Sequence, residues 1–116
     1  MISKSDIEAA LDSCGYPWRE PSFAPAKTPA PPYIIIRDRL EFNGPDFSVG
    51  LVGHDTRILL YDGGGPDGNA ARVKVASALA STGAHFTQYP SDYDYDLKLF
   101  ETEFWVNEEY YEKWSE

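Results

Sequence analysis

Hydrophobic residues near the start of the chain follow a helical spacing. Four apolar residues recur three and four positions apart: Ile7, Ala10, Leu11 and Cys14. This spacing places them on one face of a short amphipathic helix of about two turns. Ser5 and Glu8 have the spacing of a capping box, in which the serine accepts from the backbone of the third residue on and the glutamate reaches back. Gly15 favours a left-handed conformation, so we expect the helix to end there.

Extended patterns dominate the middle of the chain. The β-forming run Tyr33–Ile36 opens a first strand, and an extended segment from Phe47 to Tyr61 forms a second. The turn cluster of residues 43–46 lies between them, and a tight turn there would make the two strands antiparallel neighbours. Glycine and polar residues within the second strand predict a bulge or bend. These residues are Gly50, Gly53, His54 and Asp55.

The second half of the chain predicts a helix and two more strands. A loop over residues 62–69 contains four glycines, and residues 70–82 carry an apolar stripe at helical spacing that Gly83 ends. Residues 85–89 are expected to form a third strand. The acidic turn, residues 91–96, precedes a fourth strand in which alternate residues share one face. These residues are Phe100, Thr102, Phe104 and Val106.

Together these elements predict one small α+β domain over residues 1–116. Their order is helix, strand, strand, helix, strand, strand, with both helices packed on one face of a mostly antiparallel four-stranded sheet. Two segments have little regular pattern of their own. One is a proline-rich arm over residues 16–32, and the other is an acidic, aromatic tail over residues 108–116.

The arm contains six of the nine prolines in the chain. Because proline lacks a backbone donor and fixes φ, we expect the arm to be extended rather than helical or part of a central strand. Trp18 and Phe23 are its two bulky anchors. Such an arm either lies across its own domain or reaches onto a neighbouring subunit.

The charge of the chain limits what it can bind. Nineteen acidic residues against ten basic residues give a net charge of −9 for 116 residues. Such a surface repels phosphate, so we expect no tight general binding of nucleic acid and no attraction to anionic membranes. No apolar stretch is long enough to span a membrane, and the first residues lack the apolar region of a signal peptide.

Residues 63–68, Gly-Gly-Gly-Pro-Asp-Gly, match the glycine spacing of a dinucleotide-binding loop between a strand and a helix. However, Asn69 and Ala70 stand where a phosphate-binding P-loop needs lysine and a hydroxyl residue. Asp62 and Asp67 would oppose the phosphates. We therefore interpret this segment as a flexible surface loop.

Four acidic residues have the ligand spacing of an EF-hand calcium loop: Asp92, Asp94, Asp96 and Glu103. Three short carboxylates and a bidentate glutamate can surround one Ca²⁺. Leu97 replaces the glycine that the sharp turn needs, and Gly83 and Pro90 prevent an entering helix. The spacing supports a weak calcium site at most, and a solvated acidic turn is the main interpretation.

Catalytic groups form no recognisable pattern. The single cysteine, Cys14, and the two histidines, His54 and His85, lie on different predicted elements, which gives neither a metal-binding spacing nor a catalytic triad. We expect no enzyme activity, no cofactor and, with one cysteine, no internal disulfide.

The order of elements and several short motifs resemble the tail-terminator proteins of long-tailed bacteriophages and prophages, also called tail-completion or head–tail joining proteins. The similarity spans about residues 5–107. The motifs that carry it are Cys14-Gly15-Tyr16-Pro17, Pro31-Pro32-Tyr33-Ile34, Asp46 before the long strand, and Ile58-Leu59-Leu60-Tyr61-Asp62 at its end. The run Gly63–Gly65 and the tail after Asn107 depart from the family pattern.

The resemblance implies a structural protein without catalysis. Members of the family assemble as a ring, usually of six subunits, that caps the tail tube and offers the surface where a filled head docks. The implied partners are other copies of the chain, the tail-tube protein and a head-side connector, while phage DNA passes through without specific binding. The implied location is the neck of the virion, assembled in the bacterial cytoplasm.

Two alternatives stay open at this point. Another neck protein, such as a head-closure protein or a connector adaptor, fits the same residues. A small calcium-binding or regulatory module built on residues 92–103 is the alternative from a different class. For contacts between subunits, the candidate residues are aromatic anchors. They are Trp18, Phe23, Trp105, Tyr110, Tyr111 and Trp114.

Overall fold

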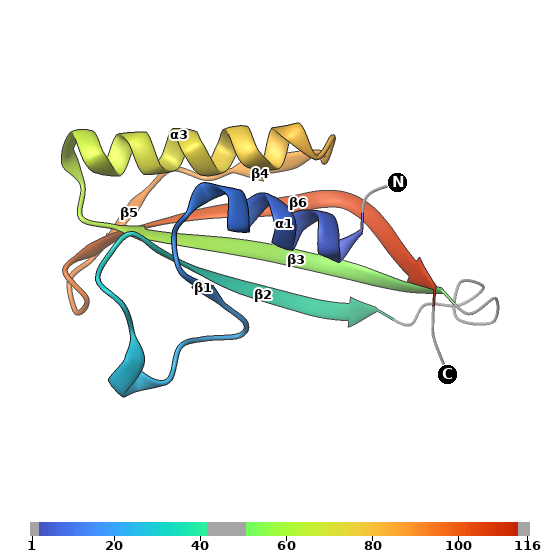
Figure 1. Ribbon diagram of the computed structural model, residues 1–116, viewed down its shortest axis with the longest axis horizontal. Helices are drawn as coiled ribbons and strands as arrows, with labels where there is room; N and C mark the ends of the chain where they lie inside the picture. The colour runs from blue at the N-terminus through green and yellow to red at the C-terminus, as the bar shows by residue number, and fades with distance from the viewer. Residues whose placement is uncertain (1–2, 42–50, 114–116) are drawn as a thin grey trace.

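The strands form one sheet, and both helices lie against the same face of it (Figure 1). The computed structural model describes residues 3–41 and 51–113, of which residues 40–41, 51–54 and 107–113 are described by their backbone alone. In chain order the elements are α1 (Lys4–Cys14), β1 (Trp18–Arg19), the 3-10 turn η1 (Pro25–Lys27), β2 (Tyr33–Glu41), β3 (Leu51–Asp62), α3 (Gly65–Ser81), β4 (Phe86–Gln88), β5 (Asp92–Asp94) and β6 (Leu99–Lys113).

The sheet has six strands in the order β1-β2-β3-β6-β4, with β5 also paired to β6. β1 runs parallel to β2, and the other described pairs are antiparallel. The predicted α+β class is confirmed, but the prediction of four mostly antiparallel strands is wrong in strand number and order. The two strands that the sequence does not predict, β1 and β5, are two and three residues long. Strands this short carry no readable period, so their pairing with longer strands defines them.

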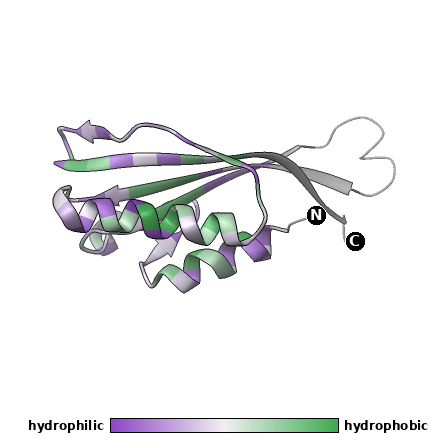
Figure 2. Cartoon of the chain, turned by 90° about the horizontal axis from the view of Figure 1, so that it is seen from above, coloured by the Kyte–Doolittle hydropathy of each residue, from purple (hydrophilic) through white to green (hydrophobic). Residues whose placement is uncertain are grey.

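The three long strands place alternate side chains on opposite faces of the sheet. Ile36 of β2, Ile58 of β3 and Phe104 of β6 share one row in the register, and all three are fully buried. They belong to one core cluster with apolar residues of both helices, and Figure 2 shows hydrophobic segments on the helices and on the strands. The buried core between the two layers includes Ile7, Leu11, Ile34, Ile36, Ile58, Leu60, Val75, Leu79 and Phe104.

α1 begins earlier than the sequence predicts. Ser3 is the N-cap: its hydroxyl accepts from the backbone N–H of Asp6 at 3.3 Å, and the Asp6 carboxylate accepts from the backbone N–H of Ser3 at 2.9 Å. The predicted Ser5–Glu8 capping box is therefore wrong. The earlier start places Lys4 in the first turn, where it forms ion pairs with carboxylates of the arm and of β2. These partners are distant in the sequence, so local spacing does not reveal them.

α3 also begins before its predicted start, at Gly65 instead of residue 70. Pro66 lies in the first turn, where its missing N–H costs no helical hydrogen bond. The predicted glycine at the other end is present: Gly83 has a φ of 82°, and Gly15 ends α1 with a φ of 79°. Among the described residues, neither helix has the length and apolarity needed to cross a membrane.

β3 and β6 are the longest strands. Their pairing confirms the predicted irregularity in β3, and the length of β6 corrects the predicted end of the last strand. The register between them shifts between His54 and Thr56, within the segment where glycines and polar residues predict a bulge. The predicted start of β3 at Phe47 lies outside the described residues. β6 continues past Val106 to Lys113, so most of the tail is a strand. The pattern of the tail does not predict a strand, and its pairing with β3 holds it extended.

The proline-rich arm folds back on its own domain, which was one of the two expected alternatives. The indole N–H of Trp18 donates to Asp12 of α1 at 2.7 Å. The ring of Phe23 packs edge-on against Tyr33 of β2, with 5.7 Å between centroids. The arm is not uniformly extended, because it contains the turn η1 and the short strand β1.

We expect Ile58→Ala to lower the free energy of unfolding by about 2–5 kcal/mol, because it leaves a cavity in the middle of the core. The matched control is Val73→Ala on α3, where the native side chain is 65% exposed. The control should change stability by about 0.5 kcal/mol or less. Chemical denaturation of both variants measures the difference, and equal losses would contradict the assigned core.

Candidate functional site

The sheet face opposite the helices carries two different surfaces along its length. Tyr33 and Tyr61 lie side by side in one row of the register. Four residues further along the same strands, Arg37 and Arg57 share a row with Trp105 of β6. Alternate residues of a strand point to the same face. Aromatic and apolar side chains therefore occupy one end of this face, and arginines occupy the neighbouring stretch of the same strands.

The first surface is the aromatic cluster, made of Tyr33, Ile35, Leu59 and Tyr61. The rings of Tyr33 and Tyr61 stack with 5.1 Å between centroids, and Phe23 of the arm packs against the cluster. The Tyr61 hydroxyl donates to Glu101 Oε2 at 2.7 Å. Burial, together with this hydrogen bond and the charge of Glu101, raises the pKa of Tyr61.

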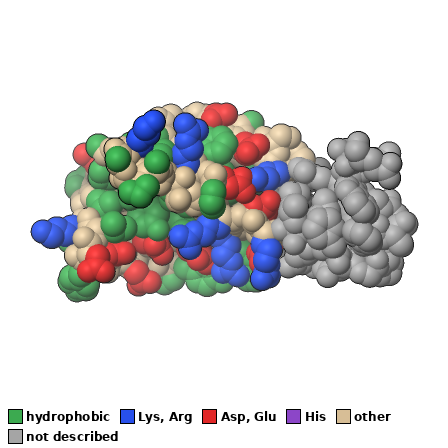
Figure 3. Space-filling view, turned by 90° about the horizontal axis from the view of Figure 1, so that it is seen from below, with side chains coloured by type: hydrophobic (Ala, Val, Ile, Leu, Met, Phe, Trp, Pro, Cys, Tyr) green, Lys and Arg blue, Asp and Glu red, His purple; other side chains and the backbone are tan. Residues whose placement is uncertain are grey.

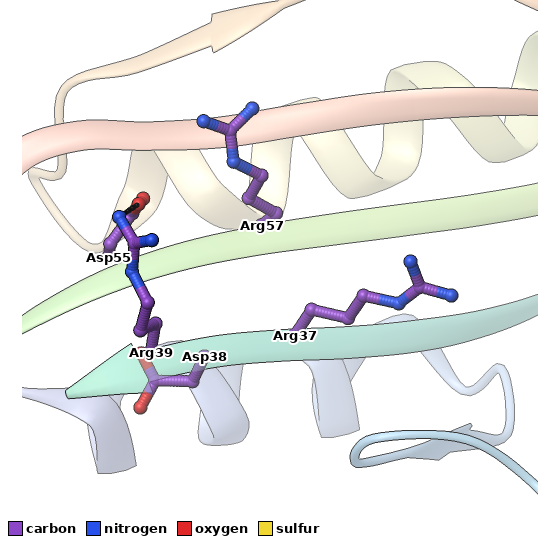
Figure 4. Close-up of a pocket in the computed structure, with 5 residues that line it drawn as sticks. All are labelled: Arg37, Asp38, Arg39, Asp55 and Arg57. Carbon is purple, nitrogen blue, oxygen red and sulfur yellow. Dashed lines mark hydrogen bonds and ion pairs between the residues drawn. The ribbon is translucent and has the colours of Figure 1, made fainter.

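The second surface is the arginine patch, made of Arg37, Arg39 and Arg57, three of the five arginines in the chain. Figure 4 shows these side chains on the face of β2 and β3 turned away from the helices. Arg57 donates to Glu103 Oε2 at 2.9 Å, and its guanidinium carbon lies 4.7 Å from the centre of the Trp105 ring. The patch is therefore built from two neighbouring strands and supported by the third.

Asp55 supports the middle of the patch. One of its carboxylate oxygens accepts from Arg39 at 3.2 Å, and the other accepts from the indole N–H of Trp105 at 2.8 Å. Asp38, in contrast, belongs to the opposite face: it accepts from the Thr56 hydroxyl at 2.8 Å and pairs with Lys4 of α1. The alternation of β2 thus divides its charged residues between the two faces.

Arg37 differs from the other two arginines of the patch. It is exposed, and it forms no hydrogen bond or ion pair with the residues that the structure describes. Its side chain extends along β2 toward the aromatic cluster (Figure 4).

Arg37 also borders two cavities. One, of about 270 Å³, is lined by Arg37, Asp38, Arg39, Asp55 and Arg57. The other, of about 180 Å³, has Phe23, Tyr33, Tyr61 and Leu97 among its walls. Arg37 therefore offers an unpaired cation between a charged cavity and an aromatic one.

The predicted loop over residues 62–69 is too long, because α3 already begins at Gly65. Asp62, at the end of β3, is fully buried and accepts from Arg72 of α3 through Nε at 3.0 Å and Nη2 at 2.9 Å. It also accepts from the backbone N–H of Gly64 at 2.8 Å. A Cβ on Gly68 would overlap the same carboxylate. Gly68 therefore leaves room for the buried ion pair that joins the end of β3 to the start of α3.

The residues with EF-hand spacing lie on a β-hairpin. Asp92 and Asp94 belong to β5, and Asp94 Oδ1 accepts from the backbone N–H groups of the two residues after Tyr95. Glu103 instead binds Arg57 on the open sheet face. Among the residues whose side chains the structure describes, no group of three or more His, Cys, Asp or Glu is placed to hold a metal ion.

The remaining candidate groups are dispersed. Cys14 is buried, and burial raises the pKa of its thiol, although the charge of Lys74 partly opposes this. His85 is exposed just before β4. The side chain of His54 lies outside the described residues.

Three of the aromatic interface candidates have contacts within their own chain. Trp18 and Phe23 anchor the arm, and Trp105 supports the arginine patch. The backbones of Tyr110 and Tyr111 lie in β6, but their side chains, and all of Trp114, lie outside the described residues. Their role in an interface stays a prediction.

The arginine patch is the feature that the sequence analysis missed. Its signal was present in part, because Arg37 and Arg39 alternate around Asp38 with the period of a strand. Arg57 is twenty positions away from Arg37 in the sequence, and the antiparallel register of β2 and β3 brings it alongside.

We expect Arg72→Met to cost about 3–5 kcal/mol of stability, because it leaves the buried Asp62 carboxylate without its cation. The matched control is Arg57→Met, which breaks an ion pair whose two side chains are 41% and 29% exposed. That change should cost about 1 kcal/mol or less. Urea denaturation of the two variants compares the pairs, and similar losses would contradict the structural role of Asp62.

The raised pKa of Tyr61 predicts a pH effect above neutrality. A tyrosine whose pKa is higher in the folded state stabilises the protein below its unfolded value of about 10, and this contribution is lost as the pH rises further. Stability of the native protein should therefore fall more steeply between about pH 9 and 11 than that of Tyr61→Phe. Denaturation curves over this range test the effect, and parallel losses would exclude it.

No family model, curated protein or solved structure matches the chain. The candidate site therefore consists of what the chain itself presents: a sheet face with a buried aromatic cluster under the arm and, beside it, an arginine patch in which Arg37 has no ion pair with a described residue.

Proposed function

We propose that this chain is a structural subunit of a tail-terminator-like ring in a long-tailed bacteriophage or prophage. The observation that carries the proposal is the one-sided sheet, whose second face is covered in part by the arm and presents the arginine patch beyond it. A subunit of a ring needs such a face for contact with a neighbour. The resemblance of the sequence motifs to tail-terminator proteins supplies the kind of assembly.

In this proposal the ring caps the tail tube and offers the surface on which a filled head docks. Its partners are other copies of the chain, the tail-tube protein and a head-side connector. The net charge of −9 supports a passage through which phage DNA moves without specific binding, since like charges repel. The ring belongs to the neck of the virion and assembles in the bacterial cytoplasm.

Light scattering over a concentration series, with negative-stain images of the same samples, tests the assembly. We expect closed rings with about six times the 13.0 kDa mass of one chain. Because a tube can act as the template of the ring, the same experiment is repeated with polymerised tail-tube protein. Binding at one end of the tube is then the expected result.

A chain that stays monomeric at every concentration and leaves tube ends bare contradicts the proposal. Binding to a head-side connector but not to tube ends favours another neck role, as a head-closure protein or connector adaptor. A calorimetric titration with Ca²⁺ separates the structural role from a calcium-binding module, because the structural role predicts no heat at micromolar metal.

A further inference from the structure

One end of the open sheet face presents opposite charges that are not paired with each other. Arg37 has no ion pair among the described residues, as noted above. The neighbouring acidic turn carries Asp92 and Asp96, both exposed, and neither side chain has a hydrogen bond or ion pair with a described residue. Leu97, next to the turn, lines the same 180 Å³ cavity as Arg37, yet no bond joins the turn to Arg37.

The acidic turn and the residue after it also expose large side chains, although the ring of Tyr95 contacts Tyr93 edge-on, with 4.9 Å between centroids. Tyr95 is 82% exposed and Leu97 is 50% exposed. The hairpin that presents them is held by Asp94, which accepts from the backbone of the turn at 2.9 and 3.0 Å. Exposed aromatic residues on a well-held support are typical anchors of protein interfaces.

The two surfaces are complementary in chemistry. The turn offers a carboxylate next to an aromatic ring. The cavity between Phe23, Tyr33 and Tyr61 offers aromatic walls with the Arg37 guanidinium at the rim. Figure 3 shows one side of the molecule, on which several basic side chains gather across the lower middle of the described surface and some acidic ones lie to their left.

We propose that the acidic turn of one copy docks against Arg37 of a second copy, with Asp96 paired to the guanidinium and Tyr95 seated in the adjoining aromatic cavity. A second copy is the favoured occupant because the chain carries both charges of the contact, and neither Arg37 nor Asp96 has an ion pair with a described residue. In this head-to-tail arrangement the contact joins two different patches, so it can repeat from copy to copy until a ring closes. The inference rests on the proposed function for the ring, but the contact itself can be tested separately.

Two opposite charge reversals test the contact: Arg37→Glu and Asp96→Lys. Each variant alone faces like charges across the proposed contact, so its assembly should weaken by about tenfold or more. An equimolar mixture should restore assembly, because the reversed arginine site of one variant then meets the reversed turn of the other. Sedimentation measures both effects. The matched controls are Lys74→Glu and Asp67→Lys on α3, which make the same changes in charge on the helical layer and should leave assembly unchanged.

A second measurement keeps the inference testable where the free chain assembles weakly. In a Cys14→Ser background, Arg37→Cys and Asp96→Cys variants are mixed and mildly oxidised. Cross-linked pairs should form well above the level given by Val73→Cys with Asp96→Cys. Chains that neither cross-link above that control nor respond to the mixture overturn the proposed contact.

The outcomes distinguish the contact from the ring. Rings that form equally well with both single charge reversals overturn the contact and leave the ring proposal in place. Specific cross-links and rescue by mixing, but with assemblies no larger than a dimer, support the contact and contradict the ring. If the control variants Lys74→Glu and Asp67→Lys also fail to assemble, the loss of assembly follows from the change in net charge, and the proposed contact is overturned.

Discussion

The register of β3 between β2 and β6 is the constraint on which the rest of this structure depends. It places Ile36, Ile58 and Phe104 in one buried row and places Arg37, Arg57 and Trp105 in the next row on the opposite face. A slip of one residue would exchange the two faces, burying arginines under the helices and exposing the core. The same register therefore produces the hydrophobic core and the arginine patch.

The buried ion pair between Asp62 and Arg72 connects this sheet to its helical layer. Asp62 ends the most central strand, and Arg72 lies one turn past Gly68 in α3. The Asp62 carboxylate also accepts from the backbone N–H of Gly64, and Gly68 is needed because a Cβ there would overlap this carboxylate. A glycine pattern that resembles a nucleotide-binding loop is explained here by packing between a strand and a helix.

The uncovered part of the sheet gives the chain its most distinctive surface. An acidic chain places three of its five arginines on one face, beside an aromatic cluster that its own arm covers in part. Asp55 and Glu103 each pair with one of these arginines, which leaves Arg37 available for a partner. Attraction between such a site and the acidic remainder of another copy is the physical basis of the proposed assembly.

The sequence by itself determined the α+β class, the two helices and the paths of the long strands, because these features follow from local periodicity and from glycines at helix ends. The sequence predicts too late a start for α3, because Pro66 and the adjacent glycines are typical of a loop. Local propensity gives no sign of the Asp62–Arg72 ion pair that holds this end of the helix against β3. Pairing with distant segments defines β1, β5 and the extension of β6, so their own residues do not predict them. Only the tertiary structure decided which arginines share a surface, because strand register, and not sequence distance, brings Arg57 beside Arg37.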